Sequence, residues 1–171
     1  MSVLRAWFYA PRGDTRHWLN DLVAALDGPF AHCELQFEGG EASSIYHGTT
    51  ARLVAREFDR AFYTLLTLPC TRAQHDRALA SARAAVGTPF SSLAMTNAYL
   101  GLPLAPSGTF CSKLNADALV AAGVLAPRDT RGITPSALHR ALAPPAPRAL
   151  PAPHGPAPSA PLDWAHPRPQ Y

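Results

Sequence analysis

The sequence predicts an α+β protein with a central antiparallel sheet and a helix, packed against that sheet, that begins with a cysteine. Three observations support this class. Residues 31–37 alternate between apolar and polar side chains, as in a strand with one apolar face. A Gly-Gly turn follows at once, so the next strand returns antiparallel. The predicted strands are linked by hairpins, which leaves little room for the crossover helices of a parallel sheet.

Composition indicates one globular domain followed by a tail. The chain has 171 residues, of which 47% are hydrophobic, and this length is enough to bury a core. Ten of its 18 prolines follow Ala143. We therefore expect a folded domain over residues 1–143 and an extended Pro/Ala-rich tail over residues 144–171.

Charge and hydropathy exclude several classes of function. The formal charge of +3 is spread along the chain without a run of like charges, so no nucleic-acid partner is predicted. No segment approaches the roughly 18 to 20 apolar residues that a membrane-spanning helix needs, and no secretory signal is present. The expectation is a soluble protein synthesised in the cytoplasm.

The first half of the chain contains the predicted sheet. Residues 3–10 form a strand, and residues 15–26 form a helix. The apolar residues of that helix share one face: Trp18, Leu19, Leu22, Val23 and Leu26. In the strand 31–37, Ala31, Cys33, Leu35 and Phe37 lie on the apolar face, and His32, Glu34 and Gln36 lie on the polar face. Further strands are expected at 44–47, at 52–58 and, as a fully buried strand, at 62–68.

The second half is predicted to be helical. Thr71 caps a helix that runs to about Val86, with Leu79, Ala82 and Val86 on its inner side. Helices follow over 92–100 and from Cys111 to about Ala122, separated by the loop 101–108. Thr134 and Pro135 open a last helix that ends at Leu142.

Cys111 is the candidate nucleophile. It lies in the first turn of its predicted helix, where unpaired backbone N–H groups and the helix dipole favour an anion and so lower the pKa of a thiol. Buried cysteines more often serve only as small hydrophobic residues, and this is the role expected of Cys33 and Cys70. Neither a disulfide framework nor a metal site is predicted from the three cysteines, and no motif requires a cofactor.

His32 is the candidate base, because it lies on the polar strand face that a helix-borne thiol can reach. Glu34 is two residues further along the same face, about 6.5 to 7 Å away by the rise of a strand, and can orient the imidazole. His47, on the next predicted strand, is the rival for this third role. A solvated Glu34 and a His47 that serves only as a turn residue are the plainer interpretations.

Taken together, these segments resemble a known superfamily over residues 3–142. AHCELQF followed by a hairpin, then FCSKLNADALVAAGV, then TPSALHRAL, are similar to the permuted NlpC/P60 papain-like cysteine peptidases, especially their small phage and viral members. Two departures from that pattern concern substrate contacts. Lys113 stands where the family often has an acidic residue, and Gly87-Thr88-Pro89 replaces a glycine followed by Tyr-Asp.

The resemblance implies a thiol hydrolase. Cys111 would be the nucleophile, His32 the general base and Glu34 the orienting residue, with the backbone N–H of Cys111 in the oxyanion hole. The implied substrate is an amide, in a peptide or a cell-wall peptide. The alternatives are a lipid acyl hydrolase or acyltransferase, and a virion or assembly protein that keeps the papain-like shell and binds a neighbour through its tail.

The tail carries its own prediction. Its prolines remove backbone donors and fix φ, so it cannot join the domain's sheet or helices, while Leu162, Trp164 and Tyr171 offer apolar anchors for a protein partner. A chain ending near Ala143 is therefore expected to keep its melting temperature but lose a partner in a pull-down. A drop of more than a few degrees in the absence of partner would contradict this.

Overall fold

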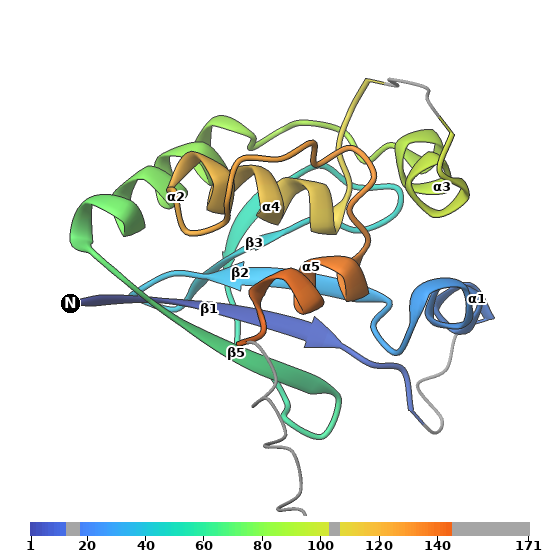
Figure 1. The fold of residues 1–171 in the computed structure, drawn as a ribbon, viewed down its shortest axis with the longest axis horizontal. Helices are drawn as coiled ribbons and strands as arrows, with labels where there is room; N and C mark the ends of the chain where they lie inside the picture. The colour runs from blue at the N-terminus through green and yellow to red at the C-terminus, as the bar shows by residue number, and fades with distance from the viewer. Residues whose placement is uncertain (13–17, 103–106, 145–171) are drawn as a thin grey trace, which may run out of the picture.

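A five-stranded antiparallel sheet forms the centre of the computed structural model, which describes residues 1–12, 18–102 and 107–144 (Figure 1). The strand order is β4-β3-β2-β1-β5. The strands are β1 (Ser2–Tyr9), β2 (His32–Gln36), β3 (Glu41–Ser44), β4 (Arg52–Ala55) and β5 (Tyr63–Cys70). The α+β class with an antiparallel sheet is thus confirmed.

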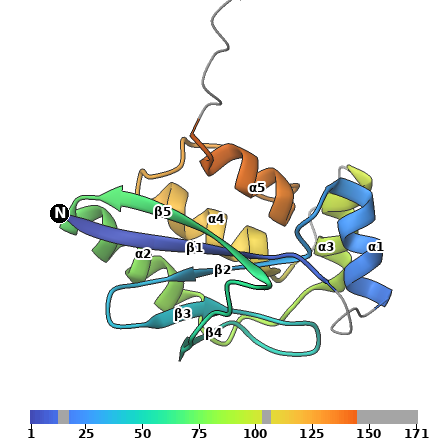
Figure 2. The same ribbon diagram turned by 90° about the horizontal axis from the view of Figure 1, so that it is seen from below.

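Helices cover one face of the sheet and one of its ends. They are α1 (Trp18–Asp27), α2 (Arg72–Ala84), α3 (Ser92–Leu100), α4 (Cys111–Ala121) and α5 (Pro135–Leu142). Figures 1 and 2 show α2, α4 and α5 over one face, and α1 with α3 at the end where β1 finishes and β2 begins. No helix in the described ranges has the length and apolar character needed to cross a membrane.

The core lies between the sheet and its covering helices. Alternate residues of β1 and β2 point into it, among them Leu4, Phe8 and Leu35, which are 0% exposed. They meet Leu114 and Leu119 of α4 in one apolar cluster. The predicted apolar face of the strand 31–37 is confirmed for Cys33, Leu35 and Phe37, all of them buried.

The opposite face of the sheet is also covered, by the chain that follows β4. Phe58 stacks on Trp7 with ring centroids 4.7 Å apart, and it meets Tyr63 edge-on at 5.1 Å. His32 and Glu34, on the polar face of β2, are likewise buried rather than solvated.

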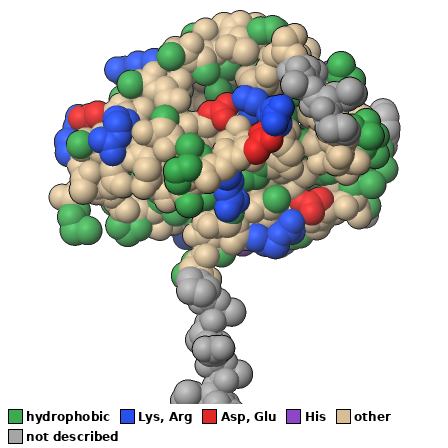
Figure 3. Space-filling view, turned by 45° about the horizontal axis from the view of Figure 1, so that its top comes forward, with side chains coloured by type: hydrophobic (Ala, Val, Ile, Leu, Met, Phe, Trp, Pro, Cys, Tyr) green, Lys and Arg blue, Asp and Glu red, His purple; other side chains and the backbone are tan. Residues whose placement is uncertain are grey.

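On the face seen in Figure 3, cationic and anionic side chains lie beside one another. Ion pairs of the described residues include Lys113–Asp117 at 2.6 Å and Arg131–Asp129 at 2.7 Å. Such pairs at an exposed surface contribute little to stability, on the order of 0 to 1 kcal/mol each.

Three strand predictions were wrong. The strand expected at 52–58 ends at Ala55, as β4. The second strand was expected at 44–47 but is β3, Glu41–Ser44, because Gly39 and Gly40 turn the chain with positive φ and pairing resumes directly after them. The strand predicted to be fully buried is β5, an edge strand with several half-buried or exposed residues. Pro69 lies inside it, which an edge strand tolerates because one side of its backbone has no partner strand.

Three apolar residues predicted to face inward do not. Leu22 and Leu26 of α1 are 48% and 55% exposed, because α1 covers the end of the sheet rather than its face, whereas Val23 is buried. Val86 is 52% exposed, since α2 ends at Ala84 and the chain turns away before it. The side chains of Trp18 and Leu19, residues 13–17 and the tail over 145–171 lie outside the described residues.

Candidate active site

Helix α4 presents Cys111 at its first residue. The N-cap residue, Phe110, is fully buried and has no side-chain acceptor, so the first-turn N–H groups are not capped by it. Ser112 anchors the same turn by donating to the Ile133 carbonyl at 2.7 Å. Uncapped N–H groups at a helix start favour an anion placed beside them.

The approach to α4 is fixed by the segment before α3. Thr109 and Ser91 pair through the Ser91 N–H, which donates to the Thr109 carbonyl at 2.8 Å. Gly108 has a φ of 91°, and a Cβ there would lie 2.8 Å from the Ser91 Cβ. Only glycine fits both the backbone conformation and the contact, so the chain enters α4 along a single path.

Cys111 reaches β2 because the β2–β3 ladder stops early. Pairing ends at Leu35↔Ser43, although the same register continued would place Cys33 opposite Ile45. Instead, the Asn115 side chain donates to the Cys33 carbonyl at 3.0 Å. Asn115 lies one turn after Cys111, so the first turns of α4 occupy the edge of β2 that β3 leaves free.

His32 and Glu34 contact each other on the opposite face of β2. The His32 Nε2 and the Glu34 Oε1 are 3.2 Å apart, and the Glu34 side chain is 0% exposed. Since Glu34 occupies Nε2, Nδ1 is the nitrogen left to exchange a proton with Cys111. Cys111 is hydrogen-bonded to the same imidazole, so the structure brings together the three residues predicted from the sequence.

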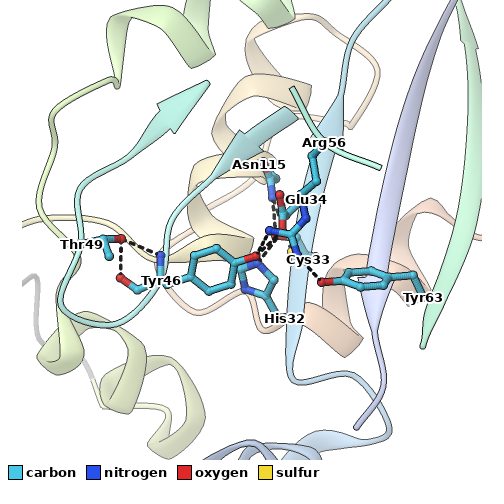
Figure 4. Close-up of polar contacts among 8 residues, drawn as sticks. All are labelled: His32, Cys33, Glu34, Tyr46, Thr49, Arg56, Tyr63 and Asn115. Atoms are coloured by element: carbon cyan, nitrogen blue, oxygen red, sulfur yellow. Dashed lines mark hydrogen bonds and ion pairs between the residues drawn. The ribbon is translucent and has the colours of Figure 1, made fainter. Parts of the chain in front are cut away.

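Glu34 has two further partners, which the sequence analysis missed (Figure 4). The Tyr46 hydroxyl donates to Glu34 Oε1 at 2.6 Å, and Arg56 Nη1 lies 3.1 Å from the same oxygen. The second terminal nitrogen of Arg56 donates to the Tyr63 hydroxyl at 3.0 Å. A fully buried carboxylate needs such charge-assisted partners to stay ionised.

One signal could have identified Tyr46. Continuing the β2–β3 register from Leu35↔Ser43 by three residues places Tyr46 opposite His32. The two rings do stack, with centroids 4.5 Å apart and planes at 23°. Arg56 carries no comparable signal, because it follows β4 in a segment without a motif.

Electrostatics favour an ion pair between Cys111 and His32. Burial by itself would lower the pKa of His32, but the charge and hydrogen bond of Cys111, followed by those of Glu34, raise it to about 9. A hydrogen bond from the Cys33 thiol is the largest cause that holds the pKa of Cys111 well below its usual value. The opposing effect of burial is outweighed by this bond together with the charge and hydrogen bond of His32 and a backbone hydrogen bond of Cys33.

Cys33 and Glu34 complete this charge distribution. Burial, followed by the nearby Cys111, raises the pKa of Cys33, which keeps it a thiol that can donate. Burial would also raise the pKa of Glu34, yet hydrogen bonds from His32 and Tyr46 and the Arg56 charge lower it. The site can therefore hold a Cys111 thiolate, a His32 imidazolium and a Glu34 carboxylate next to one another.

A cavity of about 410 Å³ opens onto this group. Cys111 and His32 line it together with mainly aromatic and aliphatic side chains, including Val23, Ile45 and Phe90. His47 also lines it, but is exposed and packs edge-on against Phe90 at 5.6 Å. Its contact is thus with Phe90, whereas Glu34 is the residue bonded to His32.

Cys70 lies apart from the site, buried at the end of β5 as a structural residue would be. Within the described ranges, no group of three or more His, Cys, Asp or Glu side chains is placed to hold a metal ion. Comparison of the chain with protein-family models, curated proteins and solved structures found no match.

Proposed function

We propose that this chain is a cysteine hydrolase of the permuted NlpC/P60 papain-like type that cleaves an amide bond, as a peptidase or amidase. The observation that carries the proposal is the buried contact series from Cys111 through His32 to Glu34, with the pKa of the thiol lowered and that of the imidazole raised. A thiolate beside an imidazolium is the reactive ground state of such enzymes.

In the proposed mechanism, the Cys111 thiolate attacks the carbonyl carbon and the carbonyl π electrons move onto oxygen. First-turn N–H groups of α4 stabilise this oxyanion. The C–N bond then breaks, and the His32 imidazolium gives its Nδ1 proton to the leaving amine. An acyl-enzyme thioester remains on Cys111. Neutral His32 next takes a proton from water, the resulting hydroxide attacks the thioester, and a carboxylic acid leaves as the thiolate re-forms.

Glu34 orients His32 in this scheme. It holds Nε2 from within a fully buried site, which leaves Nδ1 available to the thiol. Because the carboxylate is also bonded to Tyr46 and Arg56, it stabilises the imidazolium without taking its proton.

An ester or thioester of an apolar acyl group is the second candidate substrate. The lining of the cavity favours it, since its side chains are mainly apolar and the Arg56 guanidinium is already paired with Glu34. Leu22 and Leu26 of α1 are exposed on the same helix whose Val23 lines the cavity. The chemistry at Cys111 would be unchanged.

Alkylation with iodoacetamide tests the proposed thiolate without a known substrate. At pH 6 a free cysteine, with a pKa of about 8.5, is almost wholly protonated, whereas Cys111 is expected to be thiolate. We therefore expect the intact protein to incorporate one label at Cys111 at least about tenfold faster than free cysteine does. Intact-mass kinetics and peptide mapping measure the rate and the site.

The matched controls are Cys111→Ala, which should remove the fast phase, and Cys70→Ala, which should leave it unchanged. A Cys111 that reacts no faster than free cysteine would instead support the assembly-protein alternative.

A further inference from the structure

Tyr46 contacts both partners of the His32–Glu34 pair. Its ring stacks on the His32 imidazole with centroids 4.5 Å apart, and its hydroxyl donates to Glu34 Oε1 at 2.6 Å. Figure 4 shows the three side chains converging, with Tyr46 entering from the β3 side. One side chain can thus set both the plane of the imidazole and the place of the carboxylate.

The backbone of Tyr46 is itself held by a closed turn. Its N–H donates to Thr49 Oγ1 at 3.0 Å, and the Thr49 hydroxyl and N–H donate to the Tyr46 carbonyl at 2.8 and 3.0 Å. Gly48 supplies the positive φ of 76° that this turn uses. The turn therefore fixes the backbone from which the Tyr46 ring extends, as a positioning role requires.

The hydroxyl of Tyr46 is directed rather than free to rotate among acceptors. Arg56 Nη1 donates to the Tyr46 oxygen, which leaves the phenolic proton to be donated to Glu34. Burial, followed by the charge of Glu34, raises the pKa of Tyr46, so it stays a phenol where the enzyme would work.

Glu34 has no second anchor that could replace these bonds. Within the described part of the chain, its other oxygen, Oε2, is buried without a hydrogen-bond partner. Among the described residues, the polar contacts of the carboxylate are made through Oε1, with His32, Tyr46 and Arg56. Loss of one of these donors would let the Glu34 carboxylate rotate, and the His32 imidazole bonded to it would change its orientation.

We infer that Tyr46 is a positioning residue for catalysis, its ring fixing the imidazole of His32 and its hydroxyl fixing the carboxylate of Glu34. The inference rests on the proposed thiol chemistry. It adds Tyr46 as a second restraint on His32, beside the orienting role of Glu34.

The test separates proton transfer from thiolate reactivity. Tyr46→Phe keeps the stacked ring and removes the hydroxyl, and Tyr46→Leu removes both. With p-nitrophenyl acetate as the acyl probe, we expect steady-state turnover to fall roughly ten- to hundredfold in Tyr46→Phe and further in Tyr46→Leu. Small misplacements of catalytic groups cause losses of this size. The plateau rate of Cys111 alkylation at high pH, which needs no proton transfer, should stay within about twofold of wild type in Tyr46→Phe.

Thr130→Val is the control for the loss of one buried hydroxyl hydrogen bond, because Thr130 donates to Asp117 away from the site. It should lower the melting temperature without changing turnover. Wild-type turnover in Tyr46→Phe, with a lower melting temperature, would overturn the inference alone. A wild-type chain with neither a p-nitrophenol burst nor fast alkylation would overturn the proposed function, and the inference with it.

Discussion

Replacing Cys111 with alanine is expected to reduce hydrolysis of an acyl probe to the uncatalysed rate, because no other thiolate lies at the cavity. Cys33 is held as a thiol by its raised pKa, and Cys70 lies at the far end of β5. Turnover of p-nitrophenyl acetate and detection of the acyl-enzyme by intact mass measure the effect. The loss should be complete within the sensitivity of both assays.

The same substitution should leave the fold in place. It removes one sulfur from the start of a helix whose Phe110, Ser112 and Asn115 keep their contacts. A change in melting temperature of no more than a few degrees is expected, which corresponds to about 1 kcal/mol or less. Residual turnover in a folded Cys111→Ala protein would show that another group is the nucleophile.

Replacing His32 with alanine is expected to raise the pH at which Cys111 becomes reactive and to slow turnover at pH 7. Without the imidazolium, the pKa of the thiol should move toward the unperturbed value of about 8.5. The loss of proton transfer should cost turnover about 10²- to 10⁴-fold. The pH dependence of alkylation and that of turnover measure the two effects separately.

The His32 imidazole also determines how the turnover of the wild-type protein depends on pH. The pKa of His32 is raised to about 9, so its proton is present below that pH and lost as the pH rises through it. Turnover should therefore rise as Cys111 ionises, at a pH well below the usual thiol range, and fall near pH 9 as His32 can no longer protonate the leaving group.

Full activity of His32→Ala at pH 7 would require another base. His47 is the first to examine, because it lines the same cavity. Turnover of the double variant His32→Ala with His47→Ala would then show whether His47 acts as the base when His32 is absent.

Local signals in the sequence predicted most helices because capping chemistry is local. The Ser92–Leu100 and Pro135–Leu142 bounds agree with the prediction, as does the start of α4 at Cys111. The Thr71 capping box and the Thr134 cap, with Pro135 next to it, are completed by residues within three positions. Such contacts need no information from elsewhere in the chain.

Burial was predicted less well, because a periodic pattern shows which residues share a face but not what covers that face. Leu22 and Leu26 share a face of α1 and are nevertheless exposed. Glu34, on the polar face of β2, is buried because Tyr46 and the segment after β4 cover it. Both outcomes depend on where distant segments pack.

The sequence by itself determined that His32 and Glu34 lie on one strand face and that Cys111 begins a helix, since strand alternation and helix-start signals are short-range. Only the tertiary structure decided that these residues meet. The β2–β3 ladder ends at Leu35↔Ser43, and Asn115 takes the Cys33 carbonyl that a longer ladder would have used. Backbone groups of a strand must find partners, and a helix 82 residues away supplies one here.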